Sequence, residues 1–175
     1  MKRVISGVVL ILLVTVASAQ RTVQTKFGDT LTTNWIGVNI TVSDSVYIQF
    51  EGPSKSWFAL GFNAKRMQRG VDVVMVPAWK EAFMSPDPYD AVLTGYAPPK
   101  RDEVQHWQVK SEEMKEGRRS FALVRALATG DAYDFDFTEL SNNGGPFDII
   151  WAMGSEKEDK TEYHGNQKGK RTLQF

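Results

Sequence analysis

The sequence predicts an all-β protein, an antiparallel β-sandwich of about ten strands. Three observations predict it: apolar residues recur with a period of two, the apolar runs are short, and turn-forming residues separate them. Only residues 111–119 have a helical reading, and a charged hairpin tip fits that segment equally well. Many short strands with turn signals between them are typical of a sandwich.

The expected strands follow one another along the chain. Residues 38–42 alternate apolar and polar side chains, as a strand with one buried face does. Residues 71–76 form a run of the fully buried type, which ends at Pro77. The segments expected to form strands are residues 38–42, 46–50, 57–62, 71–76, 91–93, 105–109, 121–125, 147–152 and 172–175.

The first nineteen residues have the pattern of a secretory signal peptide. Lys2 and Arg3 precede an apolar run, and Ala17-Ser18-Ala19 offers small residues at a cleavage site. A membrane anchor is the alternative, but the run is shorter than the ~20 residues that span a bilayer. We expect a secreted protein whose mature part, residues 20–175, forms one domain without a transmembrane segment. Asn39-Ile40-Thr41 is an N-glycosylation sequon, so a glycoprotein is expected in a eukaryotic host.

Composition excludes several functions. Residues 20–175 hold 19 basic and 21 acidic residues, a net charge of −2, which argues against a nucleic-acid partner. The chain has no cysteine, so disulfides, thiolate metal sites and covalently attached haem are excluded. No sequence motif for a nucleophilic, phosphate-binding or dinucleotide site is present. We therefore do not expect an enzyme.

An acidic cluster near Gly130 has two readings. It consists of Asp131, Asp134, Asp136 and Glu139. A solvated turn that leads into a strand is the simpler reading, and a calcium or sugar site is the alternative, although the spacing of an EF-hand loop is absent.

Two residues lie in unusual surroundings. Met67 is flanked by cationic and polar residues, where no apolar period requires a methionine, and His164 lies in a polar turn bounded by glycine. A methionine that caps the core and a solvent-exposed histidine are the simpler readings. A thioether and an imidazole are also a known pair of axial haem ligands, which raises the reduction potential of the iron. His106, beside Trp107, is expected to be a packed or exposed strand residue.

Five segments together resemble the DOMON domain family. They are Trp57-Phe-Ala-Leu-Gly-Phe62, Met67 followed by Asp72-Val-Val74, Arg125-Ala-Leu-Ala-Thr-Gly-Asp131 with Asp134, Ile149-Ile-Trp-Ala152 with Gly154, and Tyr163-His-Gly165 with Lys168-Gly169 and Leu173. The resemblance covers nearly all of residues 20–175 and implies a ligand-binding β-sandwich.

The cytochrome branch of the family binds one haem b noncovalently, and Met67 and His164 fall where its ligands fall. The resemblance therefore implies a secreted electron-transfer domain, a cytochrome b, with an extracellular redox partner. Trp57 and Trp151 are expected to line the pocket, and Lys65, Arg66 and Arg69 to neutralise the haem propionates. The alternatives are a haem-free module that binds a carbohydrate or another small extracellular ligand, and an adhesion domain.

Overall fold

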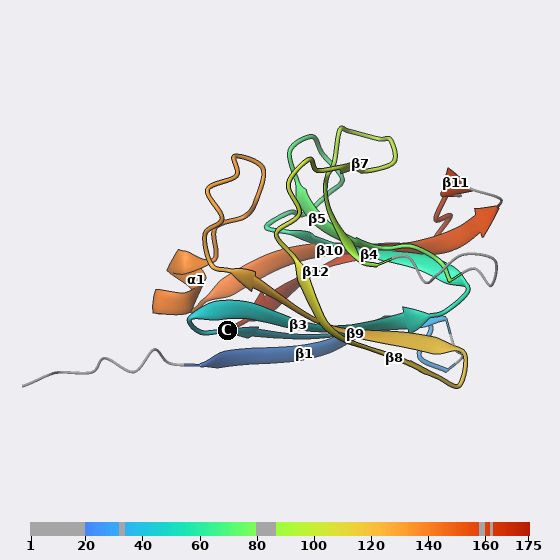
Figure 1. Cartoon of the computed structure of the whole chain (residues 1–175), viewed down its shortest axis with the longest axis horizontal. Helices are drawn as coiled ribbons and strands as arrows, with labels where there is room; N and C mark the ends of the chain where they lie inside the picture. Colours follow the sequence, from blue (N-terminus) through green and yellow to red (C-terminus); the bar gives the residue numbers. More distant parts are fainter. Residues whose placement is uncertain (1–19, 32–33, 80–86, 158–159, 162) are drawn as a thin grey trace, which may run out of the picture.

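Two antiparallel sheets lie face to face. The computed structural model describes residues 20–31, 34–79, 87–157, 160–161 and 163–175, with one sheet below the other in Figure 1. The predicted β-sandwich is confirmed. The described residues form twelve strands against about ten predicted. The predicted segments omit the strand at residues 21–28 and two strands of two residues each, which are too short to leave a pattern. The signal-peptide prediction falls on residues 1–19, outside the described residues.

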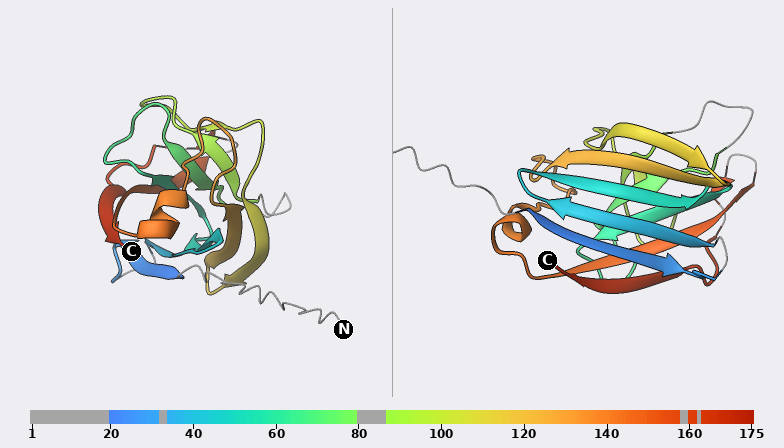
Figure 2. Two further views of the ribbon diagram at one scale, coloured as in Figure 1. Left: turned by 90° about the vertical axis from the view of Figure 1, so that its left-hand side faces the viewer. Right: turned by 90° about the horizontal axis from the view of Figure 1, so that it is seen from below.

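Five strands form the first sheet, in the order β1-β2-β3-β9-β8. Figure 2 (right) shows them side by side. The turn between β8 and β9 lies at Glu116 and Gly117, which both have positive φ. Residues 111–119 are therefore the predicted hairpin tip and not a helix. The strands are β1 (Arg21–Gly28), β2 (Trp35–Val42), β3 (Ser45–Pro53), β8 (Gln108–Lys115) and β9 (Arg118–Ala126).

Seven strands form the second sheet, in the order β11-β10-β4-β5-β6-β7, with β12 also paired to β10. Within the described ranges there is one short helix, α1 (Thr138–Asn143), which covers an end of the sandwich (Figure 2, left). The strands are β4 (Ser56–Phe62), β5 (Asp72–Val76), β6 (Tyr89–Val92), β7 (Lys100–Arg101), β10 (Pro146–Lys157), β11 (Lys160–Thr161) and β12 (Lys168–Gln174).

The main core fills the space between the sheets. Alternate residues of each strand point inward, since successive side chains of a strand lie on opposite faces. In β4, Phe58, Leu60 and Phe62 are buried in this core. Phe62 also packs against the rings of Phe137 and Phe147, at centroid distances of 5.4 and 6.4 Å. These aromatic contacts pack β4 against β10 and against the segment that precedes the short helix.

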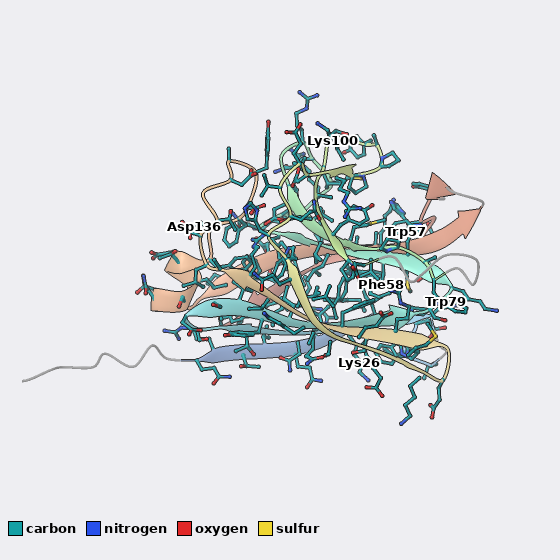
Figure 3. All side chains as sticks on the ribbon, viewed as in Figure 1. Lys26, Trp57, Phe58, Trp79, Lys100 and Asp136 are labelled. Atoms are coloured by element: carbon teal, nitrogen blue, oxygen red, sulfur yellow. The ribbon has the colours of Figure 1, made fainter. Side chains whose placement is uncertain are left out.

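The outer face of the second sheet carries a second apolar cluster. Trp57 and Phe58 are adjacent in β4 but point to opposite faces of the sheet (Figure 3). A sandwich of two sheets normally places polar side chains on its outer faces. The buried outer residues here are instead apolar: Trp57, Ala59, Ala64, Val71, Val73, Met75 and Leu93. Because these outer residues are buried, we expect connecting segments or a bound ligand to cover this face of the sheet.

The outer face of the first sheet is polar by comparison. Gln24, Asn39 and Gln49 lie opposite one another on β1, β2 and β3. Asn39 of the sequon lies on this face and is half-buried. Its glycosylation stays a prediction.

Candidate functional site

A pocket of about 610 Å³ lies on the apolar outer face of the second sheet. Ligand and cofactor pockets are typically ~300–1,000 Å³, so this one has the size of a cofactor site. Its floor consists of outward residues of β4, β5 and β10. Ala59, Gly61 and Ala152 belong to this floor. Because these side chains are short, they leave a shallow, smooth surface over the sheet.

Three connecting segments form the walls of the pocket. Residues 65–67 come from the β4–β5 connection and residues 96–99 from the β6–β7 connection. The third wall, residues 163–170, includes the turn before β12. Tyr96 and Tyr163 are 89% and 75% exposed, so their rings stand at the mouth of the pocket.

Met67 and His164 line the same pocket, although 97 positions separate them in the sequence. The connection that carries Met67 is tied to its surroundings at both ends, because Ala64 N–H donates to Asp148 O (3.2 Å) and Gly70 N–H donates to Leu93 O (2.8 Å). Met67 is half-buried and packs against the outer apolar cluster. This packing agrees with the simpler interpretation, in which the methionine caps an apolar cluster. It also places Met67 in the wall of the pocket.

His164 is half-buried, not solvent-exposed. Gln167 N–H donates to His164 O, and Met153 N–H donates to Gln167 O, both at 2.9 Å, so the turn is fastened to β10. His164 Nδ1 lies 2.9 Å from Gly165 O. In the tautomer whose Nδ1 donates to this carbonyl, the lone pair of Nε2 is free to coordinate a metal. A backbone carbonyl on the second ring nitrogen is the usual environment of a metal-binding histidine.

The charged lining residues are cationic throughout the described part of the pocket: Lys65, Arg66, Lys168 and Lys170. Lys65 is paired with Asp148 at 3.3 Å. Of the three expected propionate partners, Lys65 and Arg66 thus line the pocket, whereas Arg69 is not among its described lining residues. An apolar floor with a cationic rim suits a flat apolar ligand that carries carboxylates.

Haem b matches this combination of features. Its porphyrin face is apolar and planar, its propionates are anionic, and its iron accepts a thioether and an imidazole as axial ligands. Trp57 and Trp151, both expected in the pocket, are among its lining residues, but the indole of Trp151 packs on Phe27 in the main core, so Trp57 alone of the two presents its ring on the pocket face. The residues present therefore fit the cofactor that the sequence predicts. That Met67 and His164 bind its iron stays a prediction.

A buried ionic cluster lies on the opposite side of β5. Arg125 Nη2 donates to Asp72 Oδ2 (2.9 Å) and to Phe135 O (3.0 Å). Its Nη1 lies 3.8 Å from Asp90 Oδ2 and 3.6 Å from Asp134 Oδ1. His106 Nδ1 lies 2.9 Å from Asp134 Oδ2. Because three carboxyl groups surround one guanidinium, the cluster favours retaining a proton.

The acidic residues near Gly130 therefore do not form one cluster. Asp134 belongs to the buried cluster, with its side chain 3% exposed, whereas Asp131 and Asp136 cap local turns through contacts with Tyr133 N–H and Thr138 N–H (2.8 Å each). The solvated-turn reading is wrong for Asp134, because Arg125 and His106 draw its carboxylate into the fold. The segment leads into α1, not a strand.

Asp90, His106 and Asp134 offer ligand atoms within 4.8 Å of one another. A metal ion there would have to displace or tolerate Arg125, whose positive charge already lies beside both carboxylates. His106 precedes β8 and is packed in this cluster, so its predicted place within a strand is wrong. The sequence signal for the cluster was Asp72, an acidic residue inside the apolar run 71–76.

The sandwich is the fold that the DOMON resemblance predicts. Two solved structures share it. One is the cytochrome domain of cellobiose dehydrogenase from Myriococcum thermophilum, with a TM-score of 0.59, 11% identity, and coverage of 86% of this chain and 81% of that chain. The other is the cytochrome b domain of pyranose dehydrogenase from Coprinopsis cinerea, with a TM-score of 0.54, 15% identity, and coverage of 85% and 80%.

At sequence identities of 11% and 15%, these two comparisons show a shared fold and no more. No model of a known protein family matches the sequence, and none of the curated proteins matches it. No helix among the described residues is long and apolar enough to cross a membrane.

Proposed function

We propose that this protein is a secreted haem b-binding domain that transfers electrons, with Met67 and His164 as the axial ligands of the iron. The observation that carries the proposal is the presence of both residues on the wall of one apolar, cationic-rimmed pocket. The fold shared with two cytochrome domains supports it. The bound cofactor would supply a one-electron ferric/ferrous couple.

The protein's own residues determine how such a couple behaves. The Met67 thioether is a soft donor that favours ferrous iron, and His164 is held by Gly165 O so that one ring nitrogen remains free. The apolar floor would shield one face of the cofactor from water, and Lys168 and Lys170 at the rim would offset its propionate charges. If Met67 and His164 both bound the iron, no position on it would be left open to a substrate, so the proposed role is electron transfer and not catalysis.

Reconstitution of the purified protein with haemin tests the ligand pair. We expect a low-spin spectrum with a sharp α band on reduction, and its loss in Met67→Ala and in His164→Ala. Met114→Ala is the matched methionine control, since Met114 is 45% exposed on β8 of the other sheet. If both ligand variants retain the wild-type low-spin spectrum, the assignment is wrong.

A haem-free ligand-binding module is the alternative function. The exposed rings of Tyr96 and Tyr163 at the pocket mouth favour it, because aromatic rings stack on sugars. Calorimetric titration of the cofactor-free protein with oligosaccharides separates the two proposals. Saturable sugar binding that Tyr96→Ala abolishes, together with no uptake of haemin, would replace the haem proposal.

Secretion is part of the same proposal. Residues 1–19 would be removed, leaving residues 20–175 as one domain that meets an extracellular redox partner. Amino-terminal sequencing of the protein recovered from culture medium should start at Gln20. Retention of the intact chain inside the cell would contradict it.

A further inference from the structure

The indole of Trp57 lies flat across the neighbouring strand. Trp57 is opposite Gly154 in the pairing of β4 with β10. A Cβ atom on Gly154 would lie 2.8 Å from Trp57 Nε1, so the glycine leaves the space that the indole occupies. Trp57 is only 5% exposed, although it points to the outer face of the sheet. The indole is therefore packed into one place in the pocket wall.

Trp57 meets the ring of His164 at an edge. The ring centroids are 6.4 Å apart, and the planes are inclined by 64°. Edge-to-face contacts of this kind are favourable and directional. Tyr163 also touches His164, at a centroid distance of 4.4 Å, but Tyr163 is 75% exposed and is a less constrained neighbour. Of the two aromatic rings that contact the His164 imidazole, the ring of Trp57 is therefore the buried one.

Trp151 is a second tryptophan that packs over a glycine of the neighbouring strand, and no ring contact between Trp151 and a histidine is found in the described residues. It is opposite Gly169 in the pairing of β10 with β12, and a Cβ there would lie 2.6 Å from its Nε1. Its ring stacks on Phe27 at 5.5 Å. The arrangement of tryptophan over glycine therefore serves the sheet in both places, and of these two tryptophans Trp57 is the one whose ring contacts His164.

We infer that Trp57 is a positioning residue for His164. Its indole holds the imidazole plane so that Nε2 faces the pocket, while Gly165 O restrains Nδ1. This inference rests on the proposed haem function, since it assigns Trp57 to the surroundings of an axial ligand. Groups that orient a metal-binding histidine contribute about 10–100-fold to metal affinity.

Haemin titration of Trp57→Leu tests the inference. We expect the dissociation constant to rise about 10–100-fold, with altered g values of the low-spin ferric signal, and Trp57→Phe to recover part of the affinity by restoring a ring. Trp35→Leu is the matched control, because Trp35 lies on β2 of the other sheet. Where Trp57→Leu does not fold, Trp57→Phe is compared with Trp35→Phe.

Nuclear magnetic resonance of the cofactor-free protein gives a second readout. The chain has two histidines, so the ring signals of His164 can be assigned with His164→Gln. We expect Trp57→Phe to shift the His164 ring signals and Trp35→Phe to leave them in place. If wild type binds no low-spin haem, the proposed function is wrong. If wild type binds it and the Trp57 and Trp35 variants behave alike in both experiments, the positioning role is wrong.

Discussion

Replacing Asp90 with asparagine should remove a large part of the pH dependence of stability. Asp90 is fully buried, and burial, followed by the charges of Asp72 and Asp134, raises the pKa of its carboxyl from 3.8 to about 8. Arg125 lowers that pKa, but less than burial raises it. Asp90 is therefore protonated in the folded protein at neutral pH, and asparagine copies the protonated form.

The sign of the pH dependence of stability follows from the number of protons that the folded and unfolded states bind. Between about pH 4 and pH 8 the folded protein keeps a proton on Asp90 that the unfolded chain releases. The contribution of Asp90 to stability is thus fully present below its unfolded pKa and is lost as pH rises towards its folded pKa. One proton corresponds to about 1.4 kcal/mol per pH unit, so the free energy of unfolding loses about 4 kcal/mol from this group between pH 5 and pH 8.

Urea denaturation followed by tryptophan fluorescence measures the effect. The free energy of unfolding of Asp90→Asn, relative to wild type, should rise by several kcal/mol from pH 5 to pH 8. Asp44→Asn, at an exposed position, is the matched control and should keep a constant difference from wild type. A constant difference for Asp90→Asn over the same range would refute the reasoning, because Asp90 would then be ionised in the fold.

Three further substitutions test the packing. Phe62→Ala should lower the free energy of unfolding by about 3–5 kcal/mol in urea denaturation, since Phe62 is 2% exposed at the centre of the core; a loss below 1 kcal/mol would contradict the packing. Gly61→Val should lower the free energy of unfolding by about 1–3 kcal/mol and weaken haemin binding, because a Cβ at this position would lie 2.7 Å from Cγ1 of Ile150, which also lines the pocket; unchanged haemin affinity would argue against Gly61 as part of the haem site. Glu116→Asn should raise the thermal midpoint slightly, by about 0.5 kcal/mol of stability, since Glu116 has φ 51 and precedes Gly117 with φ 74 in a hairpin turn that favours asparagine; a lower midpoint would count against it.

The sandwich could be predicted because its inward residues alternate strictly. In β2, Ile36, Val38 and Ile40 are buried, and the residues between them face outward. The strand β1 was not predicted, because its inward positions include Thr25, a polar residue that breaks the apolar pattern. Helix α1 was not predicted either, since its six residues carry few apolar side chains and Leu140 alone of them belongs to the core.

The candidate site was only partly visible in the sequence. Met67 and His164 stood out because their polar neighbours gave no packing reason for them. The uninterrupted apolar runs 57–62 and 71–76 indicated strands buried on both faces, but the sequence did not show which segments cover the outer face. The role of Trp57 was hidden as well, because it depends on the register that places Gly154 opposite it.

The ionic cluster could not have been assembled from spacing alone. Asp72, Asp90, His106, Arg125 and Asp134 come from five segments, and only the packing of the two sheets brings them together. Local chemistry indicated single members, such as Asp72 within an apolar run. The partners that neutralise each charge are set by tertiary structure.

The near-infrared absorption spectrum of the ferric protein with haemin bound tests the central claim most directly. In low-spin ferric haem the near-infrared charge-transfer band lies at a longer wavelength when a thioether sulfur and a histidine bind the iron than when two histidines do. The account predicts the longer-wavelength band in wild type and its shift to shorter wavelength in Met67→His with the low-spin state retained. A low-spin ferric spectrum without the longer-wavelength band in wild type, or a band that keeps its position in Met67→His, would contradict Met67 as a ligand.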